Sequence, residues 1–155
     1  MTELALIMGF ILLLWGNKLP DAVAGVLDFD PLYKKYAAQY GLDWKLLKAI
    51  AQVESNENPL AKNPADPSYG LMQLLYPQKL NVDNWPPENV SMLYDPEYSV
   101  SIAAQILSWN IASFGKWRGV AVYNAWGARL DPERGPFRNQ GYVDKVQGKY
   151  AALED

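Results

Sequence analysis

The chain contains neither cysteine nor histidine. Without cysteine it can form no disulfide bond, no thiolate metal site and no cysteine nucleophile. Without histidine it can build no Ser-His-Asp triad, no imidazole general base and no zinc site of the usual kind. Any acid–base chemistry must therefore rest on aspartate, glutamate, lysine or tyrosine. We expect a function that needs no metal and no cofactor.

An excess of basic residues is also missing. Lysine and arginine number 14 against 17 aspartates and glutamates, which gives a formal net charge of −3. A nucleic-acid-binding protein usually carries a basic surface, so we expect no nucleic-acid partner. The 155 residues, half of them hydrophobic, are enough for one domain with a sound core. The 6 tryptophans and 10 tyrosines suit a carbohydrate-binding groove, and they suit a protein core equally well.

The N-terminus carries one apolar run, from Leu4 to Trp15, which contains no charged residue. It is shorter than the roughly 20 apolar residues of a spanning helix, although Lys18 can reach back to the membrane interface. We expect residues 1–18 to be a hydrophobic membrane anchor or an uncleaved signal, followed by a linker over 19–29. A cleaved signal, with small residues at 22–24, and a buried core helix remain as alternatives.

The rest of the chain, residues 30–155, has the spacing of a mainly α single domain. Apolar residues recur at intervals of three and four, and no segment shows clear period-two alternation. Asp43 and Asp95 are expected to cap helix N-termini, and Gly41 and Gly115 to end helices. The expected helices cover about 30–41, 43–58, 95–115, 117–125 and a last segment from Tyr142, with long loops at 58–69, 76–94 and 126–141.

Glu54 stands out among the residues of the second expected helix. The residues that share its helix face are apolar, namely Leu47, Ile50 and Ala51. A carboxylate on the core side is costly unless it is paired or functional, and the nearby helix C-terminus disfavours negative charge. Both effects should raise its pKa, as a glycosidic general acid requires. The alternative is that Glu54 lies at the edge of this apolar helix face and is solvated.

Glu54 belongs to the first of a set of motifs that follow one another along the chain. The set consists of Glu54-Ser55, Asn58-Pro59, the segment from Ser68 to Gln73 (SYGLMQ), the segment 121–125 (AVYNA) and the segment 142–146 (YVDKV). Together the set resembles the lytic transglycosylase family, which has the goose-type lysozyme-like fold. The resemblance covers roughly residues 31–152, most of the chain.

The resemblance implies a role for several residues. Glu54 corresponds to the family's catalytic acid, the segment 70–73 to the lining of its sugar groove, and Tyr123 to a tyrosine near the acid. The side chains suit these roles, because Gln73 can both donate and accept hydrogen bonds and Met72 offers an apolar contact to a sugar face. The expected substrate-binding residues are Ser55, Ser68, Tyr69, Gly70, Met72, Gln73, Tyr123, Asn124 and Trp126.

The chain departs from the family pattern at three positions. Glu57 stands where the family prefers an aromatic residue, and it could supply a second carboxylate. The loop before Gly70 has no clear match to the family's polar serine, although Asn63 or Ser68 could serve. Trp126 replaces an expected glycine and could be a stacking platform or a wall of the cleft.

The resemblance implies that the function is cleavage of the β-1,4 bond between N-acetylmuramic acid and N-acetylglucosamine in peptidoglycan. In this reaction Glu54 protonates the leaving oxygen and then takes the proton of the muramoyl 6-hydroxyl, which leaves a 1,6-anhydro end. The first alternative is a lysozyme-type hydrolase, with Glu57, Asp66 or Asp95 as base. The second is a non-catalytic glycan-binding membrane protein that uses the same groove.

The expected partners are peptidoglycan strands and, through residues 1–18, a membrane. Because the substrate lies outside the cytoplasm, we expect the catalytic domain to face the periplasm or the cell wall. The small size of the chain also suits a larger phage particle or a secretion assembly, and the sequence does not choose between these settings and a cellular role.

Overall fold

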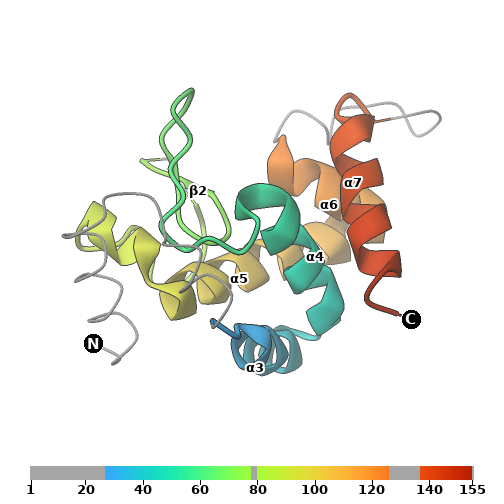
Figure 1. Cartoon of the computed structure of the whole chain (residues 1–155), viewed down its shortest axis with the longest axis horizontal. Helices are drawn as coiled ribbons and strands as arrows, with labels where there is room; N and C mark the ends of the chain where they lie inside the picture. Colours follow the sequence, from blue (N-terminus) through green and yellow to red (C-terminus); the bar gives the residue numbers. More distant parts are fainter. Residues whose placement is uncertain (1–26, 78–79, 126–136, 155) are drawn as a thin grey trace.

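The structure, a computed structural model, describes residues 27–77, 80–125 and 137–154. These residues confirm the mainly α fold (Figure 1). Residues 1–18, most of the expected linker and Trp126 lie outside the described residues. None of the described helices is long and apolar enough to cross a membrane. The elements in chain order are α3 (Asp30–Tyr40), α4 (Trp44–Ser55), β1 (Ser68–Tyr69), β2 (Leu74–Leu75), the 3-10 helix η1 (Val90–Tyr94), α5 (Pro96–Phe114), α6 (Lys116–Asn124) and α7 (Gln140–Ala151).

The expected helix caps are confirmed. Gly41 ends α3 in the left-handed conformation, and its N–H donates to the Ala37 carbonyl. The Asp43 carboxylate begins α4 by accepting from the Lys45 N–H at 2.9 Å. The Asp95 carboxylate begins α5 in the same way, accepting from the Glu97 N–H at 3.0 Å. Short polar side chains at these positions satisfy N–H groups that the helix itself cannot pair.

Two features differ from the sequence-based expectation. Helix α4 ends at Ser55 and not near Asn58, because Asn56 and Glu57 adopt left-handed conformations with φ of 53° and 58°. The segment after the following loop forms a small antiparallel hairpin, in which β1 pairs with β2. Two strands of two residues each are too short to show an alternating pattern in the sequence.

Helix α5 packs against α3 and α6, and α4 packs against α3 and α7. Figure 1 shows α7 beside α4 and α6, with the hairpin on the other side of α4. Gly119 permits close packing of α6 on α5, since a Cβ there would lie 2.9 Å from the Ile111 side chain. The arrangement brings the last turn of α4 next to both the hairpin and the C-terminal helices.

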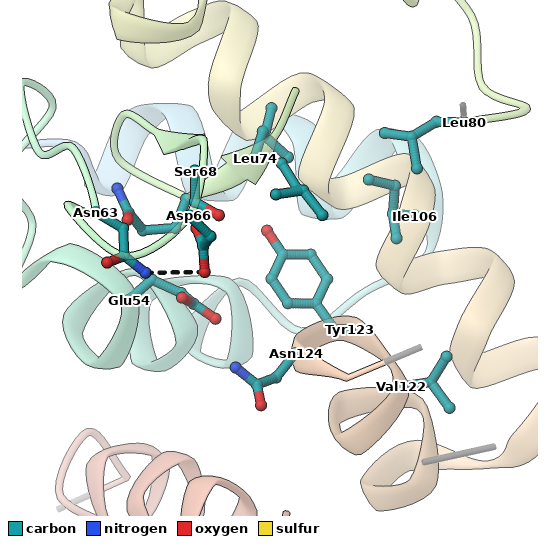
Figure 2. A pocket seen from close by; sticks show the side chains of 12 residues that line it. Glu54, Asn63, Asp66, Ser68, Leu74, Leu80, Ile106, Val122, Tyr123 and Asn124 are labelled. Carbon is teal, nitrogen blue, oxygen red and sulfur yellow. Dashed lines mark hydrogen bonds between the residues drawn. The ribbon is translucent and has the colours of Figure 1, made fainter. Parts of the chain in front are cut away.

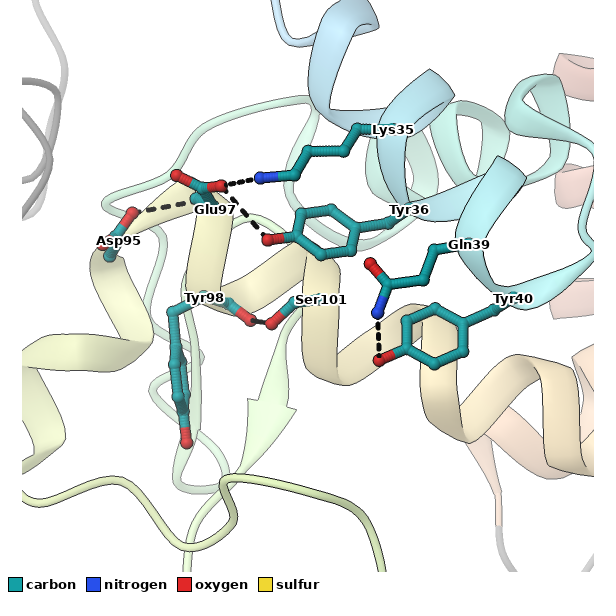
Figure 3. Close-up of polar contacts among 8 residues, drawn as sticks. All are labelled: Lys35, Tyr36, Gln39, Tyr40, Asp95, Glu97, Tyr98 and Ser101. Atoms are coloured by element: carbon teal, nitrogen blue, oxygen red, sulfur yellow. Dashed lines mark hydrogen bonds and ion pairs between the residues drawn. The ribbon is translucent and has the colours of Figure 1, made fainter.

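Helix α3 is fastened to the start of α5 on the side shown in Figure 3. The Glu97 carboxylate pairs with Lys35 and accepts from the Tyr36 hydroxyl at 3.1 Å. Leu27 and Phe29 also pack into the core, and Phe29 is 3% exposed. The last residues of the expected linker therefore belong to the packed unit.

Candidate active site

A pocket of about 220 Å³ lies between the end of α4, the hairpin with its preceding loop, α5 and the end of α6 (Figure 2). We call it the Glu54 pocket. One part of its lining is polar and consists of Glu54, Asn63, Asp66, Ser68, Gln73 and Asn124. The other part is mostly apolar and consists of Leu74, Leu75, Leu80, Ile106, Val122 and Tyr123. A polar side facing an apolar side suits a ligand with hydroxyl groups and flat apolar faces.

Glu54 sits in the last turn of α4, partly buried at the wall of this pocket. Burial raises the pKa of its carboxyl group to about 7, because the charged form loses water. The hydrogen bond from Tyr142 lowers this pKa and the negative charge of Asp66 raises it, both by less than burial does. The result is a carboxyl group that retains its proton up to neutral pH, as a general acid must.

The hydrogen-bond partner of this carboxyl group is Tyr142, which was not among the expected site residues. The Tyr142 hydroxyl, in the first turn of α7, donates to Oε1 of Glu54 at 2.6 Å. A protonated carboxyl group has one acceptor oxygen and one donor oxygen. Since Oε1 accepts from Tyr142, the proton belongs on Oε2. The sequence signal for a contact with the acid was the presence of Tyr142 in the motif 142–146. This tyrosine fits the apolar face of α7 equally well.

Tyr123 lines the pocket as expected, but its hydroxyl is used elsewhere. It donates to the Met72 carbonyl at 2.8 Å and so fastens the end of α6 to the hairpin. Burial raises the pKa of Tyr123 well above its usual value, and the charge of Glu54 raises it further. Tyr123 is therefore close to the acid and neutral, while Tyr142 makes the direct contact.

Met72 and Gly70, two of the expected substrate contacts, are buried in the structure. The Met72 side chain is 0% exposed and belongs to the hydrophobic core, and its N–H donates to the Ser99 hydroxyl at 3.2 Å. Gly70 has φ of +78°, and a Cβ there would lie 1.9 Å from the Leu93 carbonyl oxygen. Both residues therefore contribute to the packing of the hairpin, and neither lines the Glu54 pocket.

Ser55 and Tyr69 also have structural contacts and do not line the Glu54 pocket. The Ser55 hydroxyl donates to the Leu71 carbonyl at 2.7 Å, which holds the end of α4 against the hairpin segment. The Tyr69 ring packs edge-on against Tyr94 with centroids 5.9 Å apart. These two side chains stabilise the segments that form the wall of the pocket.

Ser68, Gln73 and Asn124 line the pocket. The Gln73 amide nitrogen donates to the carbonyls of Ala61 and Gly70, which directs its two donors to the backbone and leaves its oxygen as an acceptor. Asn124 is held in place because its Oδ1 accepts from Asn139 at 3.0 Å. Trp126, the remaining expected contact, lies outside the described residues.

The three candidate second carboxylates occupy different places. Glu57 accepts from the Tyr33 hydroxyl at 3.1 Å and from the Gln52 amide at 3.2 Å, and it does not line the pocket. Asp95 serves as the cap of α5. Asp66 does line the pocket, as do both candidates for the polar loop residue, Asn63 and Ser68. Within the described ranges no group of three or more histidine, cysteine, aspartate or glutamate residues could hold a metal ion.

A mainly α domain with a proton-retaining carboxyl group in a half-polar cleft is the arrangement expected of a lysozyme-like domain. The model of the family described as "Transglycosylase SLT domain" matches residues 31–141, and the chain belongs to this family. The 70 kDa soluble lytic transglycosylase of Escherichia coli has a similar structure, with a TM-score of 0.56 and 27% identity over 81% of this chain and 19% of that one.

Several curated relatives carry the name membrane-bound lytic murein transglycosylase F. The protein of Vibrio vulnificus (strain YJ016) is 34% identical over 137 residues, which cover 83% of this chain and 23% of that protein. The protein of Pectobacterium atrosepticum is 41% identical over 111 residues, which cover 66% of this chain and 21% of that protein. The chain thus spans less than a quarter of the length of these relatives.

Proposed function

We propose that the protein is a lytic transglycosylase that cleaves the β-1,4 bond between N-acetylmuramic acid and N-acetylglucosamine in peptidoglycan. Membership of the SLT domain family and the names of the relatives support this reaction class. The observation that carries the proposal is Glu54, whose burial raises its pKa to about 7 at the wall of a sugar-sized pocket.

In the first step Glu54 donates the proton on Oε2 to the glycosidic oxygen as the bond to the anomeric carbon breaks. In the second step the resulting carboxylate accepts the proton of the muramoyl 6-hydroxyl while that oxygen bonds to the anomeric carbon. The products are a 1,6-anhydromuramoyl end and a free 4-hydroxyl on the glucosamine side. One carboxyl group acts as acid and then as base, so no second acidic residue is required.

Tyr142 is the proposed positioning residue for this acid. Its hydrogen bond to Oε1 fixes the carboxyl plane, and it stabilises the carboxylate that exists between the two steps. Ser68, Gln73 and Asn124 supply polar contacts to the sugar. The apolar wall of Leu74, Leu80 and Ile106 would receive the less polar sugar faces and acetamido methyl groups.

Mass spectrometry of purified peptidoglycan after digestion tests the proposal. Anhydromuramic ends that appear with the wild-type chain and are lost with Glu54→Gln would support it. Digestion that yields only reducing ends would overturn the transglycosylase reaction, and lysis by Glu54→Gln would overturn the role of Glu54.

We further propose that residues 1–18 attach the protein to a membrane, with the domain on the peptidoglycan side. The apolar run of these residues and the membrane-bound relatives support this placement. Fractionation of membranes, comparing the full chain with one that lacks residues 1–18, tests it.

A further inference from the structure

Asn139 occupies the N-cap position of α7 but does not cap the helix. An asparagine at this position usually accepts from the first turn through its side-chain oxygen. The Asn139 side chain makes no such hydrogen bond. Its Oδ1 is buried and has no hydrogen-bond partner among the residues that the structure describes. A buried acceptor without a partner costs free energy, which indicates that another interaction holds this side chain in its orientation.

The amide nitrogen of Asn139 supplies that interaction. It donates to the Ala121 carbonyl at 2.9 Å and to Oδ1 of Asn124 at 3.0 Å. A carbonyl oxygen can only accept, so Ala121 fixes which end of the Asn139 amide faces α6. The second hydrogen of the same nitrogen then requires an acceptor, which fixes the oxygen of Asn124 on the Asn139 side. The amide nitrogen of Asn124 is left on the opposite side.

Asn124 carries this orientation into the Glu54 pocket. It is exposed, and it lines the pocket at the end of α6. Figure 2 shows its amide nitrogen turned toward Glu54 and its oxygen turned away. The pocket therefore presents a hydrogen-bond donor beside the acid. A donor at this place favours an acceptor on the ligand, such as a carbonyl oxygen, and disfavours a group that can only donate.

We propose that Asn139 is a positioning residue that makes the pocket selective for sugars with an intact N-acetyl group. The amide nitrogen of Asn124 donates to the acetamido carbonyl oxygen, and Asn139 prevents the Asn124 amide from turning over. A sugar that has lost its acetyl group carries an ammonium group instead, which has donors only and would face the Asn124 donor. This inference rests on the proposed function, since it concerns the same substrate and the same pocket.

The test measures kcat and KM on soluble glycan strands from peptidoglycan, with the N-acetyl groups either intact or removed, for the full wild-type chain and Asn139→Asp. A carboxylate can only accept, so Asn124 should turn its nitrogen to the new side chain and its oxygen into the pocket. We expect the wild type to prefer acetylated strands by about tenfold or more in kcat/KM, the size of one hydrogen bond. Asn139→Asp should lower this preference by about tenfold, through KM on acetylated strands more than through kcat.

Two further variants separate orientation from charge and from folding. Asn139→Ala removes the contact to Asn124 without adding a charge, and it should also lower the preference. Gln140→Glu is the matched control, because it adds the same charge one residue along and its Oε1 can still accept from the Phe137 N–H. Its preference should equal that of the wild type. Circular dichroism checks the fold of each variant, and Asn139→Ala decides the matter if Asn139→Asp does not fold.

The outcomes separate this inference from the proposed function. A wild type without preference, or an unchanged preference in the Asn139 variants, would overturn the selectivity and leave transglycosylation intact. An equal loss on both kinds of strand would also overturn it, because Asn139 would then be purely structural. An equal shift in Gln140→Glu would assign the effect to charge and overturn the inference. Reducing ends formed with the preference intact would support Asn139 and overturn transglycosylation, and no cleavage by the wild type would overturn both.

Discussion

Glu54 and Glu57 lie three residues apart at the end of α4, yet they face different parts of the molecule. Glu54 is directed to the pocket and to α7, where the Tyr142 hydroxyl meets it at 2.6 Å. Glu57 is directed to α3, where the Tyr33 hydroxyl meets it at 3.1 Å. Each carboxyl group accepts from a tyrosine, but only Glu54 borders a cavity in which a substrate could reach it.

The backbone between them produces this separation. In a continuing helix, residues three apart would share a face. Instead Asn56 and Glu57 adopt left-handed conformations, which end the helix and turn Glu57 away. The role of each glutamate is therefore decided by the helix end and by the element opposite it. Residue type alone would make the two equivalent.

The largest expected effect is on activity at Glu54. Glu54→Gln should reduce the lysis of purified peptidoglycan by about 10³-fold, because glutamine keeps the shape and the Tyr142 contact but supplies no proton. A turbidity assay measures the rate. Glu57→Gln is the matched control from the other side of the helix end, and equal losses in the two variants would contradict the distinction.

The next effect is on stability and depends on pH. The folded-state pKa of about 7 lies above the usual 4.5. Below about pH 4.5 the carboxyl group is protonated in both the folded and the unfolded state, so its ionisation does not reduce the free energy of unfolding. The reduction grows as the pH rises and is complete above about pH 7. Glu54→Gln should therefore be more stable than the wild type by about 1–3 kcal/mol at pH 8. At pH 4 the two should unfold alike in urea, and a constant difference across this range would contradict the raised pKa.

A smaller effect is expected at Tyr142. Its hydrogen bond lowers the pKa of Glu54, so Tyr142→Phe should raise that pKa further. The activity, which falls at high pH as Glu54 loses its proton, should then persist to higher pH. The rate at its optimum should drop by about tenfold, the cost of one lost charge-assisted hydrogen bond. A pH–rate profile measures both effects. If the fall in activity at high pH stays in place or moves to lower pH, the role of Tyr142 as the partner of Glu54 is contradicted.

The smallest effect is expected at Glu57. Glu57→Gln should leave the rate of lysis within about twofold, because the side chain lies outside the pocket. It should lower the free energy of unfolding by about 1 kcal/mol or less, since glutamine can still accept from Tyr33. Urea unfolding at pH 7 measures this loss. A large fall in activity without a loss of stability would place Glu57 in the reaction.

Much of the fold was predictable because its signals are local. Helix caps such as Asp43, Asp95 and Gly41 act on their own helix ends, and the apolar periodicity acts within one helix. Glu54 was predictable for a related reason, as a carboxyl group on an apolar face. The hairpin was not predictable, because its two short strands are stabilised by packing of the whole segment, including the contact of Gly70 with the Leu93 backbone.

The candidate site was predictable where a side chain's environment follows from its own helix. The site was not predictable where segments distant in the sequence form the environment of a side chain. Met72 has the flexible apolar side chain of a ligand contact, but the surrounding core encloses it completely. Tyr123 and Tyr142 are both plausible partners for the acid, and only the docking of α6 and α7 shows that Tyr142 donates to it.

The partner of Glu54 lies 88 residues further along the chain, in the last helix. The contact closes a loop of that length, so it forms later in folding than the contacts within a single helix do. The hydrogen bond at Glu54 is therefore a property of the assembled domain, and a peptide that contains α4 alone would lack it.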